Sequence, residues 1–445
     1  MQHTQPLPAG TKLSIFIHSV FDTGIIIDTF SLSNQEYRQH AKQATMLLQQ
    51  RYPYAKWVQE DQTTIQGSDD ASDFLPLLNL SYVTAICPTL LTQNNLHFEL
   101  TSGNVCTITL SPATVYFHSF GAGIISLKAL IHWHQPCTLT DLSEVNTHLL
   151  AKLALLVEER LVELISAFSQ EMQASQVPLY TTPFPNLMPA AVHRDVLYWS
   201  HFVYTAQTAN AANITNVAEW LAPLMMPIDQ QGVSNMALKP NRYIYLGWGR
   251  SMICCSTDID NQTLHSYVRT LEIRDYLWKT LYDLDRGLRN AILQSRSAQS
   301  QKQARKLANK LRSLDFRVKS ILEELTPFKV TFDHEKIWLL QQLDNNWFTS
   351  DLIASVQSRL ESFCEFYDYS EESTSQAREA RLRSVLNLIG LVATTGTIVT
   401  IINYFDPFNQ LPMPIRLLIL AASLAVVIAI FFLAVAISRR VRPED

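Results

Sequence analysis

The chain has 445 residues and a formal net charge of −5, from 35 Lys and Arg residues against 40 Asp and Glu residues. This near balance excludes a general nucleic-acid-binding protein, which usually carries a basic field. Hydrophobic residues make up 47% of the chain and charged residues 17%, where about 25% is usual for a soluble domain, so the composition indicates membrane segments.

Residues 1–260 have the pattern of a cytoplasmic α/β domain, in which short apolar runs typical of strands alternate with longer helical stretches. The expected strands are 13–18, 24–28, 97–100, 105–110, 115–118 and 124–134, and the expected helices are 33–51 and 140–172. Thr140 is the expected N-cap of the second helix.

A weak internal repeat suggests that this domain contains two β-β-α units. Residues 115–123 form an expected strand that ends in glycine, followed by another strand and a long helix, and residues 242–251 begin the same order of elements. Two such units predict one sheet with its helices on one face.

Residues 261–384 form the expected helical stalk region. Residues 351–383 contain neither proline nor glycine, and we expect one long helix that continues into the membrane. Its apolar residues follow the 3–4 spacing of a coiled coil, at Ile353, Val356, Leu360, Phe363 and Tyr367. Eight basic residues between 296 and 319 indicate either a solvated helix face or attraction to anionic lipid headgroups or a nucleotide.

Two uncharged segments, 385–404 and 417–437, predict a transmembrane hairpin over residues 385–438. Each matches the roughly 20 apolar residues that a helix needs to cross the hydrocarbon core, and a pair of buried core helices is the alternative interpretation. Arginines flank the hairpin on both sides, so the positive-inside rule places both termini in the cytoplasm, with a basic tail at 439–445. The expected localisation is the inner or plasma membrane, as a multi-pass protein.

The first of these segments carries polar residues that predict either a pore lining or a packing surface. Asn387, Thr394 and Thr397 share about a quarter of the helix circumference, and Thr400 and Asn403 return partly to that face if the helix supercoils. In a ring of several copies this face lines an aqueous path. Small and hydroxylated residues also pack helices together in lipid, so both interpretations stay open.

The loop between the two segments contains one acidic residue, Asp406. In a homo-oligomer it repeats as a ring of carboxylates at the outer mouth, which attracts cations. The alternative is a solvated loop residue that precedes the turn-forming Pro407.

Common catalytic and cofactor-binding motifs are missing from the sequence, which favours a protein that is not an enzyme. His132 and His134 lie on one side of an expected strand, but a metal site needs further ligands. Asp69, Asp70 and Asp73 indicate either a site for a hard cation or a solvated loop. The six scattered cysteines, without a signal peptide, are expected to be reduced cytosolic thiols.

From about residue 355 to 442 the chain resembles the CorA-like family of metal-ion transporters. The resemblance rests on the helical stalk, the polar first span, the short loop and the basic end at Ser438-Arg439-Arg440. At the outer end of the first span the chain has Tyr404-Phe405-Asp406-Pro407, where the family has Tyr-Gly-Met-Asn. The resemblance implies a homopentamer that passes divalent cations, magnesium in the best-known members.

The sequence therefore predicts an α+β cytoplasmic domain, a long helical stalk with coiled-coil character and a C-terminal two-helix transmembrane hairpin. The predicted function is an oligomeric ion channel in the membrane, gated by its cytoplasmic domain. The alternative is a membrane-anchored cytoplasmic sensor, adaptor or membrane-permeabilising effector whose hairpin is mainly an anchor. Expected partners are the lipid bilayer, further copies of the chain and an unknown cytoplasmic ligand or protein, but no nucleic acid. No cofactor is identified, apart from a divalent cation as the transported or regulatory ion.

Overall fold

The computed structural model describes the chain in segments separated by gaps. They are residues 5–27, 34–58, 83–87, 95–118, 120–156, 160–174, 179–181, 200–225, 232–257, 259–297 and 333–362, with isolated positions between 365 and 425. The chain divides into two compact units, one of residues 1–291 and 314–357 and the other of residues 292–313 and 358–445. The fold described below belongs to the first unit, apart from residues 292–297 at the end of helix α5 (Asn261–Ser297).

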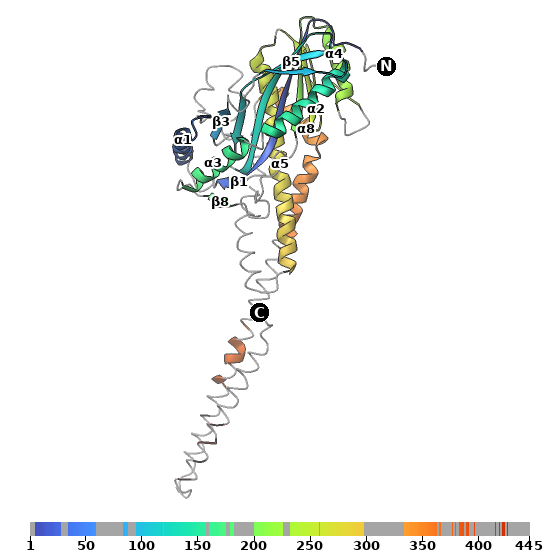
Figure 1. Ribbon diagram of the computed structural model, residues 1–445. Helices are drawn as coiled ribbons and strands as arrows, with labels where there is room; N and C mark the ends of the chain where they lie inside the picture. Colours follow the sequence, from blue (N-terminus) through green and yellow to red (C-terminus); the bar gives the residue numbers. More distant parts are fainter. Residues whose placement is uncertain are drawn as a thin grey trace. The chain divides into compact units, whose positions relative to one another are not determined.

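Eleven strands of the described segments form a single sheet (Figure 1). The strands are β1 (Thr11–Ile27), β2 (Lys56–Val58), β3 (Val83–Cys87), β4 (Asn95–Glu99), β5 (Val105–Leu110), β6 (Ala113–Phe117), β7 (Phe120–Trp133), β8 (Leu179–Thr181), β9 (Ser200–Thr208), β10 (Arg242–Leu246) and β11 (Arg250–Ser256). Their main order is β10-β11-β9-β1-β7-β6-β3-β2, with β8 paired to β1, β5 paired to β7, and β4 paired to β5. Neighbouring strands are antiparallel except β11 and β9, which are parallel.

Helices cover both faces of this sheet. The helices are α1 (Asn34–Arg51), α2 (Leu139–Leu156), α3 (Val162–Ala174), α4 (Asn213–Leu221), α5 (Asn261–Ser297) and α8 (His334–Asn346), with a 3-10 turn at Ala222–Leu224. Residues from α1 to α4 pack in one apolar core, whereas residues from α5 and α8 pack in another. The prediction that the helices share one face is therefore wrong, because α2 and α5 belong to different cores.

The central strand β1 contributes side chains to both cores because successive residues of a strand point to opposite faces. Leu13, Ile15 and Ile17 belong to the core with α1 to α4. Phe16 belongs to the core with α5 and α8. His18 is two residues further along β1 and shares the face of Phe16, so an ionisable side chain points toward α5.

Helix α2 begins at Leu139, one residue before the expected N-cap Thr140. The Oγ1 of Thr138 accepts a hydrogen bond from the backbone N–H of Asp141 at 3.2 Å, and the Asp141 carboxylate accepts one from the N–H of Thr138 at 2.9 Å. This reciprocal arrangement is a capping box, so Thr138 is the residue that starts the helix.

Helix α5 is buried on all sides over residues 270–277 although this stretch contains charged side chains. Arg274 forms an ion pair with Asp344 of α8, and Glu272 pairs with Arg269 at 2.9 Å. Asp275 is paired with two histidines of the sheet. These pairings allow charged groups to be buried, since an unpaired buried charge is strongly destabilising.

No helix of the described segments is long and apolar enough to cross a membrane. Charged residues interrupt the longer helices: α2 includes Asp141, Glu144 and Lys152 within 18 residues. This finding corrects the expected fold class with a transmembrane hairpin and the expected multi-pass localisation in the inner or plasma membrane. The expected spans 385–404 and 417–437 lie outside the described residues, apart from isolated positions.

Candidate metal centre

The expected pore and mouth residues cannot be placed from the structure. All of them lie outside the described segments: Asn387, Thr394, Thr397, Thr400, Asn403 and Asp406. The acidic residues Asp69, Asp70 and Asp73 also lie outside them.

The two histidines noted near the end of β7 lie on the surface. His132 and His134 are exposed, and the Nε2 of His134 lies 3.4 Å from the Oγ1 of Thr107. In the described part of the chain neither belongs to a group of three metal-ligating side chains. They therefore offer no built site.

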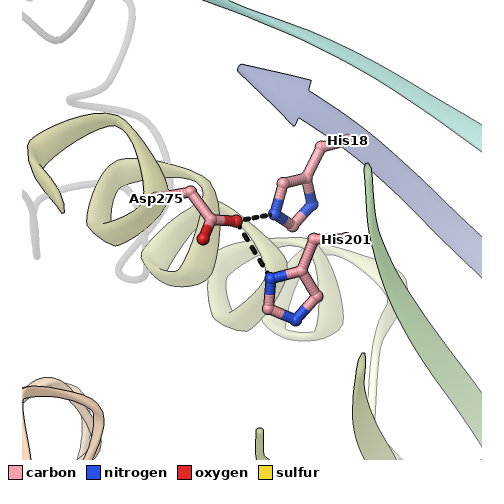
Figure 2. Close-up of side chains that lie close together, drawn as sticks. All are labelled: His18, His201 and Asp275. Atoms are coloured by element: carbon pink, nitrogen blue, oxygen red, sulfur yellow. Dashed lines mark hydrogen bonds and ion pairs between the residues drawn. The ribbon is translucent and has the colours of Figure 1, made fainter. Parts of the chain in front are cut away.

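A different group of three residues has the composition of a metal centre. His18 of β1, His201 of β9 and Asp275 of α5 each offer one ligand atom, and these atoms lie within 4.8 Å of one another. His18 and His201 are direct partners in the antiparallel register of β1 and β9, so their side chains leave the sheet on the same face. Asp275 approaches them from the helix that covers this face (Figure 2).

Both imidazole rings point toward one oxygen of the Asp275 carboxylate, as Figure 2 shows. The Nε2 of His18 forms a hydrogen bond with Oδ2, and the Nδ1 of His201 lies 3.0 Å from the same atom. The ring centroids are 4.8 Å apart. All three residues are buried, with at most 1% of each residue exposed.

The electrostatics of this group keep a charge inside the protein. Burial raises the pKa of Asp275, but the facing imidazoles and their hydrogen bonds outweigh burial and lower it to about 2. Burial is also the main influence on His201, whose pKa falls below its usual value despite the opposing effect of Asp275. Near neutral pH, Asp275 is thus an ionised acceptor, and the two facing nitrogens carry the donated protons.

The ring nitrogens that point away from Asp275 have different surroundings in the two histidines. The Nε2 of His201 lies 2.8 Å from the Oγ of Ser251, which in turn accepts the backbone N–H of Gly247 at 3.2 Å. The Nδ1 of His18 is buried and has no hydrogen-bond partner in the described segments. Ser251 therefore fixes the orientation of His201, while no described group contacts the far nitrogen of His18.

These donors fit a transition-metal ion. Zinc binds imidazole nitrogen and carboxylate oxygen at about 2.0–2.2 Å, which in a tetrahedron separates two ligand atoms by about 3.3 Å. The facing atoms of His201 and Asp275 are 3.0 Å apart and those of His18 and Asp275 are closer still, so an ion requires both separations to widen, the one with His18 by more. Each ring would then carry its proton on the far nitrogen, and the Oγ of Ser251 lies where it would accept a hydrogen bond from the Nε2–H of His201.

Ser251, His201 and Asp275 also follow the atom order of a hydrolase triad, in which serine meets Nε2 and aspartate meets Nδ1. A nucleophile must reach its substrate, however, and Ser251 is 0% exposed. The arrangement therefore favours a closed binding site over acyl transfer.

Aromatic side chains adjoin the group on the side of α8. The Trp347 ring centroid lies 5.9 Å from that of His201 and 5.4 Å from that of Trp248. Trp248 contacts Trp278 of α5 at 4.7 Å. This apolar wall keeps water from the site and strengthens electrostatic interactions within it.

Sequence reasoning missed this group because its members are far apart in the chain, in β1, β9 and α5. In the sequence, His18 is a polar residue within the otherwise mostly apolar run 13–20. A histidine inside an apolar strand is the one feature of the sequence that points to this group. Its pairing with His201 follows only from the register of β1 and β9.

No family model matches the chain, and no curated protein or solved structure gives a significant match.

Proposed function

We propose that the protein is a metal-responsive regulatory protein that binds one transition-metal ion, preferably zinc, through His18, His201 and Asp275. The observation that carries the proposal is the convergence of two imidazoles and one ionised carboxylate within 4.8 Å in a fully buried place. We thereby identify a ligand for the cytoplasmic sensor that is the alternative to an ion channel. The ion-channel function remains a prediction without a described pore residue.

The ligand chemistry supports zinc over magnesium. Magnesium prefers oxygen ligands in octahedral geometry and keeps several waters, whereas imidazole suits zinc, iron, nickel and copper. Two of the three donors here are imidazole nitrogens. The regulatory ion that the sequence suggested as magnesium is therefore reassigned to a transition metal in this proposal.

Burial supports a regulatory role over a catalytic one. A catalytic zinc ion is held by three protein ligands, the number offered here, but it also keeps its fourth position open to substrate or water. Here His18, His201 and Asp275 are each at most 1% exposed, and apolar rings adjoin them. An ion bound in such a place changes the stability and conformation of the protein rather than reacting with a substrate.

The test is zinc titration of the full chain by isothermal calorimetry, with the metal content after dialysis measured by mass spectrometry. We expect about one zinc ion per chain, and a loss of affinity of more than about 100-fold in His201→Ala and Asp275→Asn, beyond the 10–100-fold effect of an outer-shell change. His132→Ala, an exposed histidine, is the matched control and should bind as the unmodified protein does. Equal affinity in all four proteins would refute the proposal.

A further inference from the structure

The junction after α8 adjoins the metal centre and contains a strained residue. Helix α8 ends at Asn346, Trp347 follows as its C-cap, and a further helical stretch begins at Thr349. Between them Phe348 has a φ of +51°, in the left-handed region that bulky side chains rarely adopt. Packing of its side chain does little to offset this strain, because the residue is 57% exposed.

Neighbouring contacts hold this conformation in place. The N–H of Trp347 donates to the carbonyl of Leu343 at 2.8 Å, and the carbonyl of Trp347 accepts the indole N–H of Trp278 at 3.2 Å. The carbonyl of Phe348 accepts the N–H of Leu352 at 3.1 Å, which opens the next helix. A strained residue persists only where its surroundings over-determine it, and here Trp347 supplies most of that constraint.

Trp347 also connects the junction to the metal centre. Its ring contacts the ring of His201 at 5.9 Å, and only 2% of the residue is exposed. On α5, Trp278 lies three residues after Asp275, so the helix that presents the carboxylate also holds the carbonyl of Trp347. Trp347 therefore contacts the ligand His201 directly, and it contacts Trp278, which lies on the same helix as the ligand Asp275.

The helix after the junction has a second connection to α5. The Oγ of Ser355 lies 2.7 Å from a carboxylate oxygen of Asp285, and Val356 is fully buried. Residues 349–357 are therefore tied to α5 at one end and to the strained junction at the other.

We propose that Trp347 and Phe348 couple metal occupancy to the helix of residues 349–357, so that this helix is the output of the regulatory site. The inference rests on the proposed function. Binding widens the separation of His201 and Asp275, and a close-packed core transmits such a displacement instead of absorbing it. Trp347 moves with His201, and the backbone of Phe348 changes conformation in response because it is already strained.

Hydrogen–deuterium exchange of the full chain, with and without zinc, tests the coupling. We expect zinc to slow exchange of residues 349–357 by about fivefold or more, the lower end of typical coupling between sites. In Phe348→Gly, which removes the backbone strain, zinc should still bind but the slowing should disappear. Asp275→Asn, whose affinity for zinc falls by more than about 100-fold under the proposed function, should give no change at a zinc concentration that just saturates the unmodified chain.

The outcomes separate the two proposals. Calorimetry on the same samples reports binding. If zinc binds and exchange of residues 349–357 stays unchanged, the coupling is wrong and the proposed function stands. If zinc does not bind, the proposed function fails and the coupling fails with it. An equal slowing in Phe348→Gly and in the unmodified chain would also overturn the role of the junction.

Discussion

Ser251 has no direct contact with the ion's expected position, yet it decides which nitrogen of His201 faces that position. Its Oγ lies 2.8 Å from the Nε2 of His201. In the metal-bound form the Nε2 carries the proton and needs an acceptor, and the hydroxyl of Ser251 supplies one.

Ser251→Ala should therefore weaken zinc binding by about 10–100-fold, because the protonated Nε2 of His201 loses its buried acceptor. Zinc calorimetry measures the effect. Ser14→Ala is the matched control. Ser14 lies on the same face of β1 as His18, and its Oγ is 2.7 Å from the Oγ1 of Thr205, away from the metal centre. Unchanged affinity in Ser251→Ala would show that His201 does not use its Nδ1 for the metal.

His118 is a second buried histidine whose environment predicts a pH dependence of stability. Its ring stacks on Tyr276 at 4.1 Å, and both ring nitrogens are buried without a partner in the described segments. Burial, with a smaller contribution from the positive charge of Arg269, lowers its pKa well below the usual value. The folded state therefore binds fewer protons at His118 than the unfolded state does.

The contribution of neutral His118 to stability is present above the unfolded pKa of about 6.5 and is lost as the pH falls below that value. Over the interval from pH 7 to pH 5 the loss is about 2 kcal/mol. His118→Phe keeps the stacking and removes the titration, so it should be more stable than the unmodified chain at pH 5 by about that amount. Urea unfolding at both pH values tests this. An identical pH dependence in the two proteins would contradict the assignment.

At this scale the sequence indicated residue types but not their partners. A histidine within an apolar run was visible at position 18, whereas its pairing with His201 depends on a register across 183 positions. Such a register follows from the pairing of whole strands, so no local pattern around His18 predicts it.

At the scale of elements, Glu335 joins α8 to β10 and α5. Its carboxylate accepts hydrogen bonds from the Nη1 of Arg242 at 3.0 Å and from the hydroxyl of Tyr267. It also accepts the backbone N–H groups of Leu238 and Lys239 at 3.1 and 3.0 Å. Glu335 is 2% exposed, so its carboxylate depends on these donors in place of water.

Glu335→Ala should destabilise the fold by about 1–3 kcal/mol, because the half-buried Arg242 and the hydroxyl of Tyr267 lose their shared acceptor. The free energy of unfolding in urea is the measurement. Glu99→Ala, at an exposed position of β4, is the control and should change stability by less than about 0.5 kcal/mol. A change in Glu335→Ala as small as in the control would mean that α8 does not depend on this network.

Element prediction succeeded where local pattern and tertiary structure agree. Strand β5, Val105–Leu110, lies where alternation predicted a strand, and buried residues alternate along it. Prediction from local pattern fails for the interior of α5. Residues 270–277 are buried on every side, and Arg274 is paired with Asp344 of another helix. A charged helix face suggests solvent contact in the sequence, and only its ion-pair partners explain its burial.

For the whole molecule, the sequence pattern predicted a mixed α and β N-terminal part but not its organisation. Helices from two regions of the chain cover opposite faces of one sheet, which places the metal centre between β1, β9 and α5. The transmembrane expectation came from the apolar segments 385–404 and 417–437 alone. Length and hydropathy are local properties, and they do not specify where such a segment packs.

Metal binding should stabilise the folded chain as a whole. An ion that binds only the folded state at 100 times its Kd adds about 2.7 kcal/mol to the free energy of unfolding. Zinc at that concentration should therefore raise the urea midpoint, and a chelator should return it to the metal-free value. Asp275→Asn should show neither change. A stabilisation by zinc that persists in this variant would assign the effect to another site.

X-ray absorption spectroscopy at the zinc edge, on the zinc-loaded full chain, tests most directly whether His18, His201 and Asp275 hold the ion. We expect a first shell of nitrogen and oxygen at about 2.0–2.2 Å, with the outer scattering of two imidazole rings. A shell of sulfur at about 2.3 Å would place the ion on cysteines, and a shell without imidazole scattering would exclude His18 and His201. Either result would contradict a metal centre formed by His18, His201 and Asp275.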